Sequence, residues 1–333
     1  MTSTARIARL LVATLGVATV VAGCSMFAEE YEPRMMPFPE ETDVAYGTEL
    51  GCNVATPESD KPCGGSQEMD IYRSDEDGPN PVAMFIHGGG FVGGDKSQGV
   101  NEEFKVLLED GWDIVAVNYR LSVDGRNRWP VPLQDLKLAV RWIKANAEEQ
   151  DWDPERVAAI GHSAGGNLAG MLATTANDPG LEPPDLPAEL QEVDSSIVAA
   201  VGQRPVSDLA LYSQSVFGNS VIDYLGCKDC PEPLAAGSVQ THVDEDSAPY
   251  LAIHGVDDSV ASPEQGEKVQ KAYEDAGIGD RFRLIVVDDG PHKFRGHEPD
   301  VRRFGGDILD WLNDGVEWAE DRAADAESES ASG

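Results

Sequence analysis

Basic residues are scarce in this sequence. Lysine and arginine together number 25 against 60 aspartate and glutamate residues, which gives a formal net charge of -35 over 333 residues. Nucleic acids and anionic lipid surfaces attract proteins mainly through clustered basic side chains. The charge balance therefore argues against both classes of partner and predicts an acidic, solvated surface.

Long apolar runs are also missing. Apolar residues make up 41% of the chain, which is ample for a core, but they are spread too evenly for a multispanning membrane protein. The apolar run at 10–21 is short, follows Arg6 and Arg9, and leads into Val-Ala-Gly-Cys at 21–24. A positive start, a short apolar stretch and small residues fit an export signal better than a spanning helix.

The end of that run resembles a bacterial lipobox. The resemblance implies that residues 1–23 are a lipoprotein signal peptide and that Cys24 becomes the lipidated first residue, at the outer face of a membrane. An ordinary secretory signal with a chance cysteine is the alternative. Residues 24–45 contain three prolines and no clear hydrophobic period, so we expect a tether there.

Cysteine is sparse as well, with five in the chain. If Cys24 is lipidated, four remain: Cys52, Cys63, Cys227 and Cys230. An even number in an exported protein favours disulfides, although three pairings are possible. A four-thiolate zinc site is the alternative, but ten residues separate the first two cysteines, which exceeds the usual ligand spacing. We therefore predict no metal site.

Glycine is abundant, and one cluster follows a predicted buried strand. Residues 82–86 form a continuous apolar run, typical of a strand buried on both faces, and lead into His-Gly-Gly-Gly-Phe at 87–91. Consecutive glycines cost backbone entropy, so the chain must need their torsional freedom or the close approach of a ligand. We interpret the amides of Gly89 and Gly90 as donors to an oxyanion. A flexible surface loop is the alternative.

A second glycine cluster surrounds a serine. Residues 161–166 read Gly-His-Ser-Ala-Gly-Gly, between an apolar strand pattern at 156–160 and a helical pattern at 167–173. That context is the one a nucleophile elbow needs, with Ser163 raised above the sheet. The amide of Ala164 would lie at a helix N-terminus, where partial positive charge favours an oxyanion. An ordinary glycine-rich turn is the alternative.

An acid and a histidine follow later predicted strands. Asp257 and Asp258 come after one strand pattern, and His292 follows the next. Active sites of open α/β sheets lie at the carboxyl ends of the strands. A serine nucleophile needs a base, and the base needs a carboxylate that fixes its tautomer. We prefer Asp258 over its neighbour and His292 over His297, because both sit nearer the centre of their turns.

Three further histidines lie beside these motifs. We expect His254 to pack under the acid turn, His87 to brace the glycine loop and His162 to flank the serine. A histidine beside a site is more often a support than a reacting group.

Strand and helix patterns alternate along the chain, which predicts βαβ units and a mostly parallel sheet. Helical spacing is found at 101–108, 133–147, 264–276 and 301–311. Residues 205–247 have weak periodicity, which suggests a small lid or a substrate-shaping insertion. We place one α/β domain at 46–316 and expect the acidic, Ala/Ser-rich tail at 317–333 to be disordered.

Together these pieces resemble the α/β-hydrolase superfamily, and within it the esterases with a His-Gly-Gly-Gly loop, both hormone-sensitive-lipase-like and feruloyl/acetylxylan-type. The resemblance covers roughly residues 69–312. Six segments carry it: 87–91, 118–121 (Asn-Tyr-Arg-Leu), 153–156 (Asp-Pro-Glu-Arg), 161–166, 254–258 (His-Gly-Val-Asp-Asp) and 291–294 (Pro-His-Lys-Phe). Pro291 and Lys293 depart from the family, where glycines are usual.

The resemblance implies an α/β-hydrolase fold with helices on both faces of the sheet and a small lid at most. It also implies a Ser163–His292–Asp258 triad without a cofactor. The expected substrates are short-chain acyl or acetyl esters, either small molecules or acylated carbohydrates. A serine peptidase of the same fold and a non-catalytic surface-binding lipoprotein are the alternatives.

Overall fold

The computed structural model describes residues 38–48, 67–98, 102–288, 290–292 and 298–332. The predicted signal peptide, the lipidation site Cys24 and the cysteines Cys52 and Cys63 lie outside these residues. Among the described residues, no helix is both long and apolar enough to cross a bilayer.

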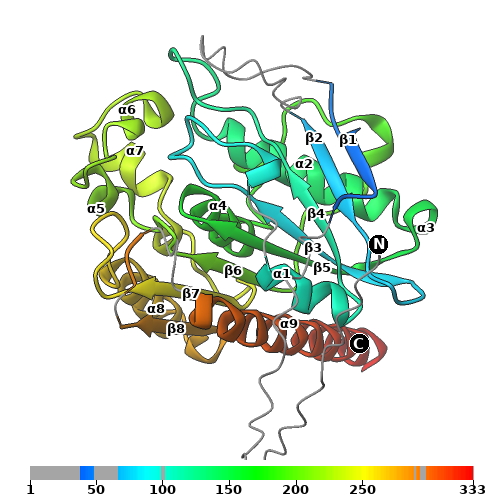
Figure 1. Ribbon diagram of the computed structural model, residues 1–333. Helices are drawn as coiled ribbons and strands as arrows, with labels where there is room; N and C mark the ends of the chain where they lie inside the picture. Colours follow the sequence, from blue (N-terminus) through cyan, green and yellow to red (C-terminus); the bar gives the residue numbers. More distant parts are fainter. Residues whose placement is uncertain (1–37, 49–66, 99–101, 289, 293–297, 333) are drawn as a thin grey trace, which may run out of the picture. The chain divides into compact units, whose positions relative to one another are not determined.

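The described residues form one eight-stranded sheet with the order β1-β2-β4-β3-β5-β6-β7-β8 (Figure 1). Its strands are β1 Glu41–Ala45, β2 Glu68–Tyr72, β3 Asn80–Ile86, β4 Asp113–Val117, β5 Trp152–His162, β6 Ala200–Gln203, β7 Tyr250–Gly255 and β8 Phe282–Val287. β1 and β2 pair antiparallel, β2 also runs antiparallel to β4, and all pairs from β4 to β8 are parallel. The predicted mostly parallel sheet is confirmed.

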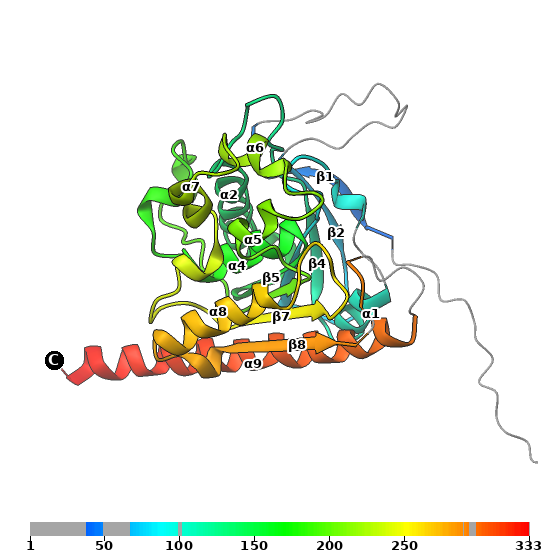
Figure 2. The same cartoon turned by 90° about the vertical axis from the view of Figure 1, so that its left-hand side faces the viewer.

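Helices cover both faces of this sheet, as predicted. The longer ones are α1 Glu102–Glu109, α2 Val131–Ala145, α4 Ala164–Thr174, α8 Glu264–Asp275 and α9 Glu298–Ser332. One core cluster joins the sheet to α2, α4 and α8, and the other joins it to α1 and α9. Figure 2 shows β7 and β8 between α8 and α9. All seven residues of β3 are buried, which explains the unbroken apolar run at 82–86.

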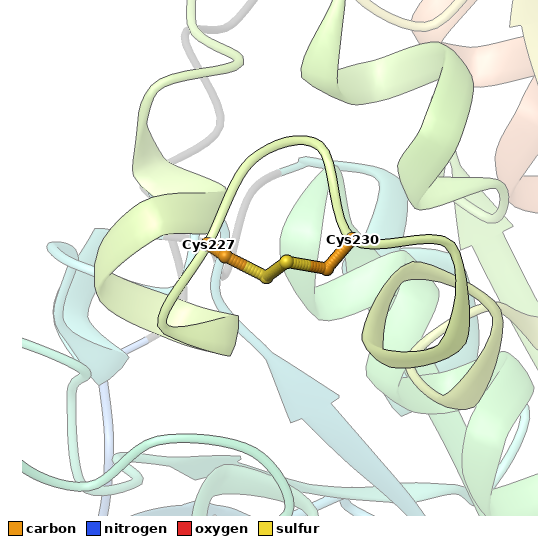
Figure 3. Close-up of a disulfide and its surroundings, with 2 residues drawn as sticks. All are labelled: Cys227 and Cys230. Atoms are coloured by element: carbon orange, nitrogen blue, oxygen red, sulfur yellow. A yellow bond between two sulfur atoms is a disulfide. The ribbon is translucent and has the colours of Figure 1, made fainter.

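The remaining elements are short. They are the helices α3 Ala147–Gln150, α5 Leu209–Ser213, α6 Ser220–Leu225 and α7 Pro231–Ala236, and the 3-10 turns η1 Lys96–Gln98, η2 Pro179–Leu181, η3 Ala188–Leu190, η4 Val239–Thr241 and η5 Gly279–Arg281. α5, α6, α7 and η4 all belong to residues 205–247, which we call the insertion. Cys227 and Cys230 are joined by a disulfide between α6 and α7 (Figure 3). Of the pairings left open, the structure therefore contains the one that joins Cys227 to Cys230. Because these two sulfurs are bonded to each other, they are not zinc thiolates.

The predicted tether is wrong at its C-terminal end. Glu41–Ala45 forms β1, which pairs with β2 so that Val44 lies opposite Met69. Tyr46, just after the strand, is buried, and its hydroxyl donates to the carbonyl oxygen of Asn118 at 2.5 Å. Tyr46 is buried in the core and Val44 packs against it, whereas the strand itself is mostly exposed. Its sequence therefore lacks the alternation that marks a strand.

The predicted disordered tail at 317–333 is also wrong, because α9 continues to Ser332. Acidic, alanine-rich composition is typical of disorder, but alanine and glutamate are also strong helix formers. The helix is held by Trp318, whose ring lies 5.0 Å from the Arg281 guanidinium and 5.2 Å from that of Arg322. Arg322 also pairs with Asp246 at 2.9 Å. Tertiary contacts thus extend the helix beyond the predicted end.

Candidate active site

Ser163 occupies a sharp turn between β5 and α4. Its backbone angles are φ 56° and ψ -113°, a conformation that a non-glycine residue adopts only at a cost. A Cβ atom on Gly161 would lie 2.0 Å from the carbonyl oxygen of Gly165, so no residue with a side chain fits there. The glycines around the serine therefore allow the main chain to close on itself, and the first helical amide, that of Ala164, follows directly.

The glycine loop at 87–91 lies beside this turn because β3 and β5 are parallel neighbours, with Ile86 opposite Gly161. A Cβ atom on Gly88 would lie 3.3 Å from the Cβ of Ser163. Gly89 has φ 124°, which excludes ordinary side chains. In the described part of the chain, no group accepts a hydrogen bond from the amides of Gly89, Gly90 or Ala164. These three predicted donors are therefore available to a substrate oxygen.

Two hydrogen bonds connect the predicted acid, base and nucleophile. Nδ1 of His292 donates to Oδ2 of Asp258 at 2.8 Å, and the Ser163 hydroxyl donates to Nε2 of His292 at 3.1 Å. Asp257 is exposed, whereas Asp258 is buried. His297, the other candidate base, lies outside the described residues. The structure thus brings together the three side chains that the sequence motifs single out.

Asp258 is held as a carboxylate. Its Oδ1 accepts hydrogen bonds from the amides of Val260 and Ala261, both at 2.8 Å. Burial alone would raise the pKa of this carboxyl, but the hydrogen bonds from His292 and the two amides outweigh burial and hold the pKa below its ordinary value. Asp258 is therefore ionised at neutral pH and can fix the tautomer of His292.

The neighbouring histidines occupy supporting positions. His87 donates from Nδ1 to the carbonyl oxygen of Gly88 at 2.7 Å, and its ring stacks on Tyr119 with centroids 4.4 Å apart. His254 is fully buried and donates from Nδ1 to the carbonyl oxygen of Ala261 at 2.9 Å. Burial lowers the pKa of both histidines to about 4, so both are neutral at pH 7. The His162 ring lies 6.0 Å from that of His292.

Sequence reasoning missed the side chains of the insertion that contact the glycine loop. Tyr212 and Ser220 lie against Gly90, and the Tyr224 ring stacks on Phe91. These residues are more than a hundred positions from the loop, in a segment without clear periodicity. No local pattern could have identified them. Among the described residues, no group of three or more metal-binding side chains was found.

The strand order, the elbow after β5 and the hydrogen-bonded serine, histidine and aspartate place the chain in the α/β-hydrolase fold class. Residues 69–273 match the family model named BD-FAE, and the chain belongs to that family.

Curated relatives agree with this assignment. The chain is 33% identical over 212 residues to the probable carboxylic ester hydrolase LipM of Mycobacterium tuberculosis, covering 61% of this chain and 47% of LipM. It is 29% identical over 224 residues to the esterase LipQ of the same organism, covering 65% of this chain and 52% of LipQ. The chain thus spans about half the length of these relatives.

Solved structures show the same fold. A truncated carbohydrate esterase from gut microbiota is similar with a TM-score of 0.67 and 22% identity, over 85% of this chain and 98% of that one. An acetyl ester-xyloside bifunctional hydrolase from Caldicellulosiruptor lactoaceticus has a TM-score of 0.61 and 21% identity, over 84% of this chain and 98% of its own.

Proposed function

We propose that this protein is a serine carboxylesterase. The observation that carries the proposal is the continuous hydrogen-bonded series from Asp258 through His292 to Ser163, with distances of 2.8 and 3.1 Å. A serine hydroxyl is a weak nucleophile unless a positioned base removes its proton, and this series supplies both the base and the carboxylate that orients it.

In the proposed reaction, Nε2 of His292 takes the Ser163 proton as Oγ attacks the ester carbonyl carbon. The tetrahedral intermediate collapses, and His292 returns the proton to the departing alcohol, which leaves an acyl group on Ser163. Water then attacks the acyl carbon while His292 takes its proton. The second intermediate collapses to release the carboxylic acid, and His292 returns the proton to Ser163. Asp258 stays ionised and stabilises the imidazolium formed in each half-reaction.

The amides of Gly89, Gly90 and Ala164 would hold the negative oxygen of both intermediates. Ala164 follows Ser163 directly, and Gly88, which precedes Gly89, lies against the Ser163 side chain. The three amides have no acceptor among the described residues, and Ala164 begins a buried helix of eleven residues. Because the helix N-terminus carries partial positive charge, it stabilises this oxygen further. Removing one such donor typically raises the barrier by about 3 kcal/mol.

Short-chain acyl or acetyl esters are the proposed substrates, either as small molecules or on carbohydrates. Curated relatives are named as esterases, and two solved structures of the same fold are titled as a carbohydrate esterase and an acetyl ester-xyloside hydrolase. These names describe the substrates of the other proteins. They support the proposed substrate class of this protein only by analogy of fold and family.

The test compares the full chain with Ser163→Ala on p-nitrophenyl acetate, butyrate and octanoate. We expect turnover that falls with acyl length and a loss in the variant on the order of 10⁴-fold or more, since the serine forms the covalent intermediate. Labelling of the wild type by a fluorophosphonate probe, absent in the variant, is the independent readout. Wild-type turnover in Ser163→Ala would disprove the assignment, and failure of the native protein to label would favour a non-catalytic binding protein.

We also propose that the protein is exported and lipid-anchored through Cys24, on the basis of the N-terminal sequence alone. In a bacterial host, we expect the full-length chain to partition with membranes and Cys24→Ser to appear in the soluble fraction. Equal membrane association of both proteins would contradict the lipid anchor.

A further inference from the structure

The glycine loop has an unusual backbone. Three consecutive residues, Gly89, Gly90 and Phe91, have φ values of 124°, 62° and 67°. Phe91 is not a glycine, so its conformation is strained and persists only where surrounding contacts determine it. The amides of the proposed oxyanion hole therefore depend on whatever packs against this loop.

Two hydroxyl groups from the insertion lie against Gly90. The Tyr212 hydroxyl and Oγ of Ser220 are hydrogen-bonded to each other at 2.9 Å. A Cβ atom on Gly90 would lie 2.9 Å from the first and 3.1 Å from the second. The pair therefore fills the space beside Gly90 and limits rotation of its peptide. Tyr212 is buried and Ser220 is half-buried, so this contact is partly shielded from solvent.

An aromatic contact holds the next residue of the loop. The rings of Phe91 and Tyr224 are stacked, with centroids 3.8 Å apart and planes 2° from parallel. The carbonyl oxygen of Phe91 accepts a hydrogen bond from the amide of Ser122 at 2.9 Å, and that of Tyr224 accepts one from the amide of Trp129 at 2.8 Å. The strained residue is thus fixed through both its ring and its main chain.

The insertion is itself anchored to the body of the domain. Asp208 begins α5, and its carboxylate accepts hydrogen bonds from the amide of Leu211 at 2.9 Å, from Gln240 at 2.9 Å and from Lys268 of α8 at 2.8 Å. α5 carries Tyr212, so the hydroxyl that contacts Gly90 is held from a fixed helix rather than from a free segment.

We propose that Tyr212, Ser220 and Tyr224 are positioning residues for the oxyanion hole. They hold Gly90 and Phe91 so that the loop amides face the carbonyl oxygen of the substrate. In this proposal the insertion is a built part of the active site. This inference rests on the proposed esterase function, because the loop amides matter only if an oxyanion forms.

The test measures kcat and KM on p-nitrophenyl acetate for Tyr212→Phe, Ser220→Ala and the double variant of the full chain. We expect each single change to lower kcat about tenfold with little change in KM, because misplaced amide donors stabilise the transition state less. The double variant should lose no more than the stronger single one, since the two hydroxyls act as one unit. Ser220→Thr, which keeps a hydroxyl, should restore most of kcat.

Tyr273→Phe is the matched control. It also removes a buried tyrosine hydroxyl, which donates to the carbonyl oxygen of Ala248 at 2.8 Å, but it lies on α8 away from the loop. We expect kcat to stay within twofold of the wild type. Thermal unfolding is measured for every variant. If Tyr212→Phe does not fold, Ser220→Ala decides the outcome, because Ser220 is half-buried at the start of a helix.

An active wild type with kcat unchanged in Ser220→Ala and Tyr212→Phe would overturn the positioning role alone. So would a lower melting temperature in these variants without any loss of kcat. A wild type that hydrolyses none of the esters would instead contradict the proposed function, and the inference with it.

Discussion

The elbow and the insertion both contact the glycine loop, but they do so with different parts of the chain. The elbow uses main chain: a Cβ atom on Gly165 would lie 2.2 Å from the carbonyl oxygen of Ile86. The insertion uses side chains, through the hydroxyls at Gly90 and the ring stacked on Phe91. Main-chain contact at this range requires glycine and so leaves a local motif, whereas side-chain contact leaves none.

The elbow and the insertion also differ in how well they tolerate substitutions. A side chain at the insertion can move or be shortened, because neighbouring residues can partly fill the space. Two backbones that touch cannot separate without shifting a strand against a helix. The elbow should therefore respond to single substitutions far more severely than the insertion does.

Gly165→Ala tests the main-chain contact of the elbow. The new Cβ would overlap the main chain at the end of β3, which cannot yield as a flexible side chain can. We expect the free energy of unfolding to fall by about 4 kcal/mol or more, with little soluble protein. Chemical denaturation of whatever protein is recovered measures this effect.

Gly306→Ala in α9 is the matched control, since its added Cβ meets no atom of the described residues within 4 Å beyond the backbone of its own helix. Alanine in a helix should leave stability unchanged or raise it by about 0.5–1 kcal/mol. Equal stability of the Gly165 and Gly306 variants would show that the elbow is not held by backbone contact.

The pH dependence of stability separates His87 of the glycine loop from Tyr212 of the insertion. His87 is neutral in the fold, with its pKa lowered to about 4 by burial, while burial raises the pKa of Tyr212 and keeps it uncharged. Between pH 6.5 and 4 the unfolded chain binds a proton that folded His87 does not. Stability is therefore full above pH 6.5 and falls as the pH is lowered, by about 1.4 kcal/mol per pH unit for one such histidine.

The measurement is the free energy of unfolding at several pH values for the wild type and His87→Asn. His254 has the same lowered pKa and remains in both proteins. These two histidines together make the free energy of unfolding fall as the pH is lowered, and the variant should lose about half of that slope. An identical slope in both proteins would contradict a neutral His87 in the fold.

Much of the fold could be predicted from sequence. The buried strands β3 and β7 read as apolar runs because both of their faces are covered. The glycine motifs were visible because backbone contact demands them. The two errors, at 41–45 and 317–332, have the opposite cause. There, composition favoured an irregular chain, but contacts of Tyr46 and Trp318 with distant residues stabilise a strand and a helix.

Sequence alone was enough to place a serine, an acid and a histidine each after a strand, because local apolar runs mark those strands. Only the tertiary structure decided which side chains meet. Ser163 and His292 are 129 residues apart and touch because β5 to β8 lie in consecutive order in the sheet. The contacts of Tyr212 and Tyr224 depend in the same way on packing between distant segments, which no local period encodes.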